Sequence, residues 1–157
     1  MSDPARILIV DDDGNILKTF SEVLRDAGYV VDTAQNGKDA IETSNANFYN
    51  LALIDIRLPD TEGTKLLTAL KETTPKMVKI IVTGYPSLQN AVEAVNKGAD
   101  GYIIKPSQAE ALLKMVREHL QKQQEAKQYS EQKVQEYVET RFRKLDTDEK
   151  QSSTKKP

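Results

Sequence analysis

The chain of 157 residues is long enough for one domain with a full hydrophobic core and a short extension, and too short for a second domain of ordinary size. Residues 1–120 hold 13 Lys and Arg against 17 Asp and Glu, a net charge of −4, and residues 121–157 hold 9 against 7, a net charge of +2, so the body lacks the basic character of a nucleic-acid-binding domain. The absence of cysteine excludes disulfides, thiolate zinc sites and iron–sulfur clusters, and the lack of a long apolar run or a signal sequence predicts a soluble cytoplasmic protein that makes no membrane contact.

The first 120 residues alternate short apolar runs with stretches of helical period, which is the pattern of βα units around a parallel sheet. Residues 7–10 are the first predicted strand, and the apolar residues after them follow a helical stripe that Gly28 stops. A second strand is predicted over residues 29–34, a second helix over residues 37–46 and a third strand over residues 51–55.

The second half of this region continues the alternation. The predicted elements are a helix marked by Leu66, Leu67 and Leu70, a strand over residues 78–83, a helix ending near Gly98, a strand over residues 101–104, and a helix that Ser107 and Glu110 begin with a capping box. The first, third and fourth apolar runs lack strict alternation, as expected for strands that helices cover on both faces. Right-handed crossovers then favour an α/β fold with a doubly wound five-stranded parallel sheet, a flavodoxin-like (βα)5 three-layer sandwich with a C-terminal helical extension.

Four of the predicted strands end in polar side chains. The first is followed by Asp11, Asp12 and Asp13, the third ends in Asp55, the fourth in Thr83, and the fifth is followed by Lys105. In an open parallel sheet the carboxyl ends of the strands lie along one edge, where such folds bind ligands. We therefore expect acids, a hydroxyl and an amine to converge on one site.

Neighbouring carboxylates repel one another unless a positive charge lies between them. Mg²⁺ fits this role, because it prefers oxygen ligands and takes only one or two protein carboxylates together with water and phosphate oxygens. We predict that Asp12 and Asp55 bind Mg²⁺ directly with the backbone carbonyl of Arg57, and that Asp11 acts through water. Asp13 is expected to lie outside the site and cap the following helix.

Asp55 has the setting of a nucleophile. A carboxylate forms an acyl phosphate when the phosphoryl group is held in line and its charge is neutralised. Mg²⁺ and Lys105 would supply positive charge, and the Thr83 hydroxyl would donate a hydrogen bond to a phosphoryl oxygen. Gly84 is expected to leave room for the group to approach.

Residues 5–120 resemble the receiver domain of two-component response regulators, and the matching segments are residues 7–13, 55–63, 80–84 and 101–106. By this resemblance the site consists of the phosphoacceptor Asp55, the acid pair Asp11 and Asp12, the switch hydroxyl Thr83, the phosphate-binding amine Lys105 and the switch aromatic Tyr102. The phosphoryl donor would be a sensor histidine kinase. Phosphorylation would draw Thr83 toward the phosphoryl group, and Tyr102 would then fill the vacated space from the surface side.

The resemblance carries further expectations. It implies a cis peptide bond between Lys105 and Pro106, and positions Arg57 and Tyr85 where they would tune the lifetime of the acyl phosphate. Two residues depart from the family pattern: Glu62 stands where Asp is more frequent, and Thr61 where an apolar residue is common. Neither departure touches the chemistry of the site.

The predicted function is a phosphorylation-dependent switch that signals by contacts with an unknown downstream protein target, and not an enzyme beyond its own phosphoryl transfer and autodephosphorylation. One alternative is a receiver fold that serves only as an interaction or dimerisation module. Another is a phosphatase of the haloacid dehalogenase type, which is disfavoured because Arg57 stands where that chemistry needs a second acid. His119 is expected to be a solvated side chain and not a phosphodonor.

Residues 121–157 are predicted to be a helical tail without a separate output domain. A helix continuing from Ser107 to Leu145 would be about 58 Å long at 1.5 Å per residue. Its distal stripe of Val134, Tyr137, Val138, Phe142 and Leu145 needs a partner. Self-association as a short coiled coil, docking on another protein and folding back on the body all remain open. The cations Arg141, Arg143 and Lys144 are expected to be solvated, and residues 151–157 to be disordered.

Overall fold

The computed structural model describes the backbone of residues 3–105 and 108–154, and side chains up to residue 145. The described strands are β1 (Arg6–Val10), β2 (Val30–Ala34), β3 (Leu51–Asp55), β4 (Val78–Thr83) and β5 (Gly101–Ile104). The described helices are α1 (Gly14–Asp26), α2 (Gly37–Ala46), α3 (Gly63–Ala69), α4 (Leu88–Asn96) and α5 (Ala109–Thr154). Strands and helices alternate along the chain as the sequence predicts.

The five strands form one parallel sheet in the order β2-β1-β3-β4-β5. This order confirms the flavodoxin-like arrangement. β2 lies on one side of β1, and β3, β4 and β5 follow on the other side, so the order in which strands are added reverses between β1 and β3. Val10 pairs with Ile54, so the residue that follows β1 lies beside the last residue of β3. Thr83 pairs with Ile104, which brings the end of β4 beside the end of β5. The register alone therefore gathers the four predicted strand ends along one edge.

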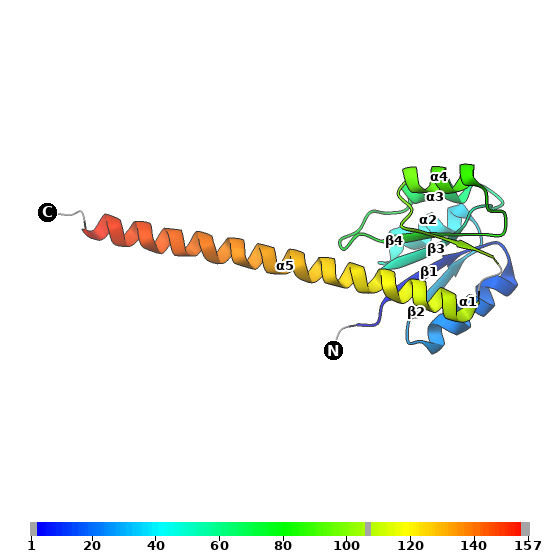
Figure 1. Ribbon diagram of the computed structural model, residues 1–157, viewed down its shortest axis with the longest axis horizontal. Helices are drawn as coiled ribbons and strands as arrows, with labels where there is room; N and C mark the ends of the chain where they lie inside the picture. Colours follow the sequence, from blue (N-terminus) through cyan, green and yellow to red (C-terminus); the bar gives the residue numbers. More distant parts are fainter. Residues whose placement is uncertain (1–2, 106–107, 155–157) are drawn as a thin grey trace. The chain divides into compact units, whose positions relative to one another are not determined.

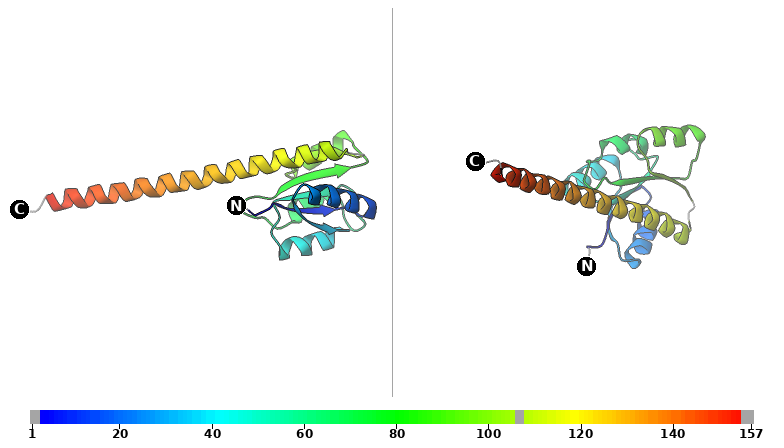
Figure 2. Two further views of the ribbon diagram at one scale, coloured as in Figure 1. Left: turned by 90° about the horizontal axis from the view of Figure 1, so that it is seen from below. Right: turned by 60° about the vertical axis from the view of Figure 1, so that its left-hand side comes forward.

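Helices cover both faces of the sheet (Figures 1 and 2), and a hydrophobic core layer lies between the helices and each face. Helix α1 and the first turns of α5 cover one face, where the buried residues include Leu17, Leu24, Leu112, Val116 and, from the sheet, Ile7, Ile9, Leu53 and Ile80. Helices α2, α3 and α4 cover the other face, over Leu8, Val10, Ile54 and Ile81. Every residue of β3 and β4 is buried, which explains why these strands lack alternation.

Helix α1 shows how local chemistry sets an element's bounds. The Asp13 carboxylate accepts a hydrogen bond from the Asn15 N–H at 2.9 Å, so Asp13 is the helix cap that the sequence predicts. Gly28 follows the helix with a φ of 98°, a conformation that favours glycine because it has no Cβ. The helix thus begins beside the acidic cluster at the end of β1.

Helix α4 differs from the others in what it buries. Ala94 is its buried residue, while Leu88 is 83% exposed, Val92 50% and Val95 68%. A hydrogen bond from the Thr64 hydroxyl of α3 to the Glu93 carboxylate of α4 ties the two helices together. The apolar side chains of α4 therefore form a surface and not a core.

Helix α5 continues beyond the predicted end. It runs to Thr154, whereas the sequence predicts an amphipathic helix to about residue 145 and disorder over residues 151–157. The physical reason is that residues 146–154 contain neither Gly nor Pro, so nothing stops the helix. The expected capping box at Ser107 and cis bond before Pro106 lie outside the described residues; within them, Thr74–Pro75 is a cis peptide.

The chain divides into two compact units, Met1–Gln121 and Lys122–Pro157. In the first, His119 is half-buried rather than solvated, because it packs beside Gly101 of β5. Among the described helices, none combines the length and the apolar content that a membrane crossing requires.

Candidate functional site

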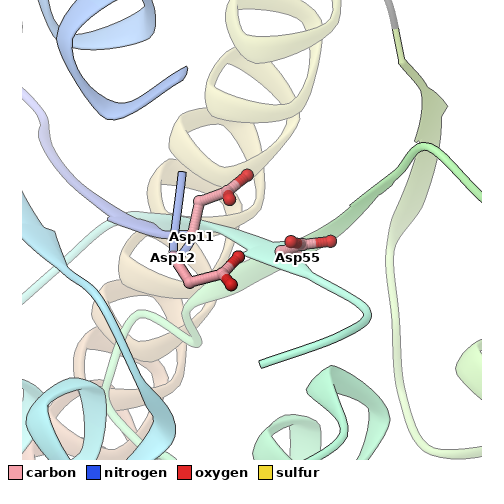
Figure 3. Close-up of side chains that lie close together, drawn as sticks. All are labelled: Asp11, Asp12 and Asp55. Atoms are coloured by element: carbon pink, nitrogen blue, oxygen red, sulfur yellow. The ribbon is translucent and has the colours of Figure 1, made fainter. Parts of the chain in front are cut away.

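Three carboxylates meet at the carboxyl edge of the sheet. Figure 3 shows Asp11 and Asp12, which follow β1, beside Asp55 at the end of β3, and one carboxylate oxygen from each lies within 4.8 Å of the others. Asp11 is 2% exposed and Asp55 9% exposed, while Asp12 faces solvent. Ligands of one Mg²⁺ lie about 3–4 Å apart, since each is about 2.1 Å from the ion. The spacing of these oxygens fits a small divalent cation.

Lys105 joins the acids from the end of β5. Its Nζ lies 2.6 Å from Asp11 Oδ2 and 3.5 Å from Asp55 Oδ2. Burial by itself disfavours the ammonium, but the hydrogen bond and the charges of Asp11 and Asp55 outweigh burial and raise the pKa of Lys105. With all four groups ionised the cluster carries two excess negative charges, which is the charge that one divalent cation offsets.

The ionised form of Asp55 is disfavoured by its surroundings. Burial and the negative charge of Asp11 raise the pKa of Asp55 to about 6, and Lys105 offsets only part of this shift. Asp55 is therefore still mostly ionised at pH 7. Its charge is held in a place where a bound cation or an added electrophile would relieve repulsion.

Thr83 lies at the end of β4 with no exposed surface. Its Oγ1 accepts a hydrogen bond from the Tyr85 N–H at 2.9 Å, and the Lys105 N–H donates to the Thr83 carbonyl at 2.7 Å. A hydroxyl that accepts one hydrogen bond can still donate another. A Cβ placed on Gly84 would come no closer than 3.9 Å to Lys105, so the protein atoms themselves leave space beside Thr83.

Arg57 and Tyr85 contact each other next to this site. The Arg57 guanidinium lies 4.2 Å from the centre of the Tyr85 ring, a cation–π contact. The Arg57 N–H also points to Asp55 Oδ1, at 3.5 Å. The two positions expected to tune the lifetime of an acyl phosphate thus form one stacked pair. Binding of Mg²⁺ by the Arg57 carbonyl stays a prediction.

Tyr102 lies inside and not on the surface side. It packs against the core under α3 and α4, and its hydroxyl is buried without a hydrogen-bond partner among the described residues. A buried hydroxyl that lacks a partner costs free energy. The role of Tyr102 as a switch stays a prediction.

The structure reveals two supporting residues to which sequence reasoning assigned no role. A Cβ on Gly63 would lie 2.0 Å from the carbonyl oxygen of Asp55, so only glycine fits there. The Asp60 carboxylate accepts hydrogen bonds from the N–H groups of Gly37 and Lys38 at the start of α2, which lowers the pKa of Asp60. Gly63 begins α3, and the contact of Asp60 with Gly37 spans 23 residues, so the sequence gives no local signal for that contact.

Comparison with known proteins gives one consistent result. Residues 7–117 match the response regulator receiver domain family. The alginate biosynthesis transcriptional regulatory protein AlgB of Pseudomonas syringae pv. tomato is 36% identical over 107 residues, which cover 68% of this chain and 24% of AlgB. The transcriptional regulatory protein DltR of Streptococcus agalactiae is 35% identical over 112 residues, which cover 71% of this chain and 50% of DltR. The chain thus spans a quarter to a half of the length of these relatives.

Solved structures agree with the sequence relatives. A CheY-like receiver domain protein from Methanospirillum hungatei is 45% identical with a TM-score of 0.75, covering 78% of this chain and 98% of the other. A response regulator from Burkholderia pseudomallei, solved with a phosphorylated aspartic acid, a calcium ion and citrate, is 31% identical with a TM-score of 0.66, covering 69% of this chain and 64% of the other.

Replacing Gly63 by Ala is expected to destabilise the protein, because the new Cβ would displace the backbone that carries Asp55. We expect the free energy of unfolding in urea to fall by at least about 2 kcal/mol. Gly14→Ala is the matched control: nothing lies within 4 Å of its added Cβ, and in the first turn of α1 it should stabilise by up to about 1 kcal/mol. Equal stability of the two variants would contradict the close approach of Gly63 to Asp55.

The raised pKa of Asp55 predicts how the metal-free protein responds to pH. Because the folded pKa of about 6 exceeds the ordinary 3.8, the stability from this group is complete below about pH 4 and is lost as pH rises through 6. Between pH 4 and 7.5 the wild type in a chelator should lose about 1–3 kcal/mol relative to Asp55→Asn. Saturating Mg²⁺ should reverse this loss. If the free energies of unfolding of the two proteins, measured in urea, change equally with pH, the raised pKa of Asp55 is refuted.

Proposed function

Because the chain belongs to the response regulator receiver domain family, we propose that it is phosphorylated on Asp55 by a sensor histidine kinase and signals through contacts with a downstream protein target. The observation that carries this proposal is the position of Lys105, whose Nζ reaches both Asp11 and Asp55 at the ends of three strands. The phosphorylated aspartic acid in the Burkholderia pseudomallei relative supports it. The proposed setting of this exchange is the cytoplasm.

The proposed transfer begins with the ionised carboxylate of Asp55. One of its oxygens attacks the phosphorus of a phosphohistidine, an O–P bond forms as the N–P bond breaks, and the imidazole leaves and takes up a proton. Asp55 needs no base for this step, since a pKa of about 6 leaves it mostly ionised at pH 7. Asp55 lies at the carboxyl edge of the sheet beside the exposed Asp12, and a donor would approach in line from that edge.

The side chains around Asp55 would stabilise the transferred group. The Lys105 ammonium would turn from Asp11 and Asp55 to a phosphoryl oxygen, and the Thr83 hydroxyl would donate to another. Mg²⁺ held by Asp12, Asp55 and the Arg57 carbonyl, with Asp11 acting through water, would neutralise charge on the phosphoryl oxygens. The all-oxygen donor set and the spacing within 4.8 Å support a hard divalent ion, as does the calcium ion in the Burkholderia pseudomallei relative.

The signal would leave through the face that α4 and β5 expose. Movement of Thr83 toward the phosphoryl group would make the inward position of Tyr102 more favourable, which shifts a two-state equilibrium at this face. Leu88, Val92 and Val95 of α4 and Ile104 of β5 are all at least half exposed there. They supply the apolar contact area that a protein target needs.

Arg57 argues against the alternative function, a phosphatase of the haloacid dehalogenase type. A haloacid dehalogenase needs an acid two residues after its nucleophile, and here that position holds a guanidinium stacked on Tyr85. We therefore propose no catalytic turnover of an external substrate. A receiver fold used only as an interaction module remains an outcome of the following test.

Incubation with Mg²⁺ and acetyl phosphate, followed by intact-mass spectrometry, is expected to add one phosphoryl group to the wild type and none to Asp55→Asn. Asp60→Asn is the matched control, because Asp60 lies five residues away on the same loop but caps α2 instead of joining the acidic cluster. It should be modified like the wild type. An unmodified wild type would favour the interaction module, and modification of Asp55→Asn would place the acceptor elsewhere.

A further inference from the structure

The second compact unit of the chain, Lys122–Pro157, presents a row of apolar side chains to solvent. The exposed apolar residues of α5 in this unit, all 42–64% exposed, are Tyr129, Val134, Tyr137, Val138, Phe142 and Leu145. At 100° per residue the last five lie on one side of the helix, within about 140°. A helix that keeps such a stripe in water has room for a partner on that side.

The centre of the stripe contains two charges as well as apolar residues. Glu131, Val134, Val138 and Arg141 follow one another at spacings of three, four and three residues, which is the spacing of a coiled-coil seam. All four side chains are exposed. A charge in such a seam lowers stability but specifies which partner and which direction are accepted.

The seam residues are placed symmetrically about residue 136, and the two charges at equal distance from it have opposite signs. Val134 and Val138 stand two residues to either side of it, and Glu131 and Arg141 stand five residues to either side, one acid and one base. A two-fold interface requires this property, since residue i must fit residue j and j must fit i. In an antiparallel pair centred at residue 136, Val134 would face Val138 of the second copy, and Glu131 would face Arg141 of the second copy.

A parallel pair would bring like charges together. Each residue would then face its own counterpart, which sets Glu131 against Glu131 and Arg141 against Arg141. Lys127, one step farther along the seam, would also face itself, whereas the antiparallel pair brings it to Leu145, nine residues beyond residue 136. Like charges in facing positions repel, so the sequence discriminates between the two directions.

Tyr137 contacts the guanidinium of Arg141 on the same helix. The Arg141 Nε donates a hydrogen bond to the Tyr137 hydroxyl at 3.1 Å, and its guanidinium lies 5.5 Å from the ring. The guanidinium is thereby held along the stripe, one turn from its own Cα. Tyr137 is adjacent to residue 136, so its ring would lie close to the two-fold axis of an antiparallel pair.

From this charge symmetry we propose that residues 127–145 of α5 pair with the same segment of a second copy of the chain as an antiparallel two-stranded coiled coil. Two Glu131–Arg141 ion pairs flank two Val134–Val138 layers in this dimer. The inference does not depend on the proposed phosphorylation, because none of these residues belongs to the acidic cluster.

Charge reversal tests the direction of pairing in the full-length chain. Glu131→Arg and Arg141→Glu should each raise the dimer dissociation constant about tenfold or more, since two attractive pairs become repulsive. The double variant E131R/R141E should return to within about threefold of the wild type, because the pairs are restored with opposite sign. Light scattering over a concentration series measures all three.

Glu139→Arg is the matched control for this series. Glu139 lies on the outer side of the helix, where its carboxylate accepts a hydrogen bond from Gln135 at 3.4 Å, so its reversal should leave dimerisation unchanged. A wild type that stays monomeric at all concentrations would overturn the proposal. So would a double variant that is no better than the single ones.

Disulfide trapping tests the register directly, because the chain has no cysteine of its own. A mixture of Val134→Cys and Val138→Cys chains should form a covalent dimer on oxidation, whereas either variant alone should not, since equivalent residues lie too far apart in the antiparallel pair. Efficient dimerisation of either variant alone would show a parallel pair. No covalent dimer in the mixture would show that residues 134 and 138 of two chains do not face each other; either result would refute the proposal.

Discussion

The repulsion between Asp11, Asp12 and Asp55 is the constraint on which the site depends. Three carboxylates share an edge of the sheet within 4.8 Å, and Asp11 and Asp55 are nearly buried. Lys105 is the only cation that reaches them in the described part of the chain, and it leaves two negative charges uncompensated. Burial and the negative charge of Asp11 together raise the pKa of Asp55, and Lys105 offsets only part of this shift. A site with this imbalance is prepared to bind a divalent cation and to hold a group that carries negative oxygens between that cation and Lys105.

Burial of apolar residues on both faces of the sheet offsets the unfavourable electrostatic free energy of the site. The pairing of Val10 with Ile54 and of Thr83 with Ile104 fixes where the polar ends fall, and the apolar residues of β3 and β4 fix the register, since a slip would expose them. Gly63 and Asp60 then hold the loop after Asp55 against the strand end and against α2. The unfavourable electrostatics of the site are thus supported by contacts that lie outside it.

Much of this could be predicted from the sequence because the signals were local. The runs at residues 51–55 and 78–83 match β3 and β4 to the residue, since continuous apolar runs flanked by polar residues have few other solutions. The gathering of Asp11, Asp55, Thr83 and Lys105 followed from the geometry of parallel sheets. Contacts between distant residues gave no local signal, as with the Arg57–Tyr85 stack and the Asp60 cap of α2. The end of α5 was placed too early because the amphipathic pattern fades near Leu145, while residues 146–154 contain no Gly or Pro that would stop the helix.

Calorimetric titration of Mg²⁺ into the chelator-treated protein tests the central claim, that the strand ends form a single charge-balanced site. The account predicts one binding site in the wild type, an affinity lower by about tenfold or more in Asp12→Asn, and an unchanged affinity in Asp13→Asn, which keeps the helix cap but stands outside the cluster. Equal Mg²⁺ affinity in the wild type and Asp12→Asn would contradict it.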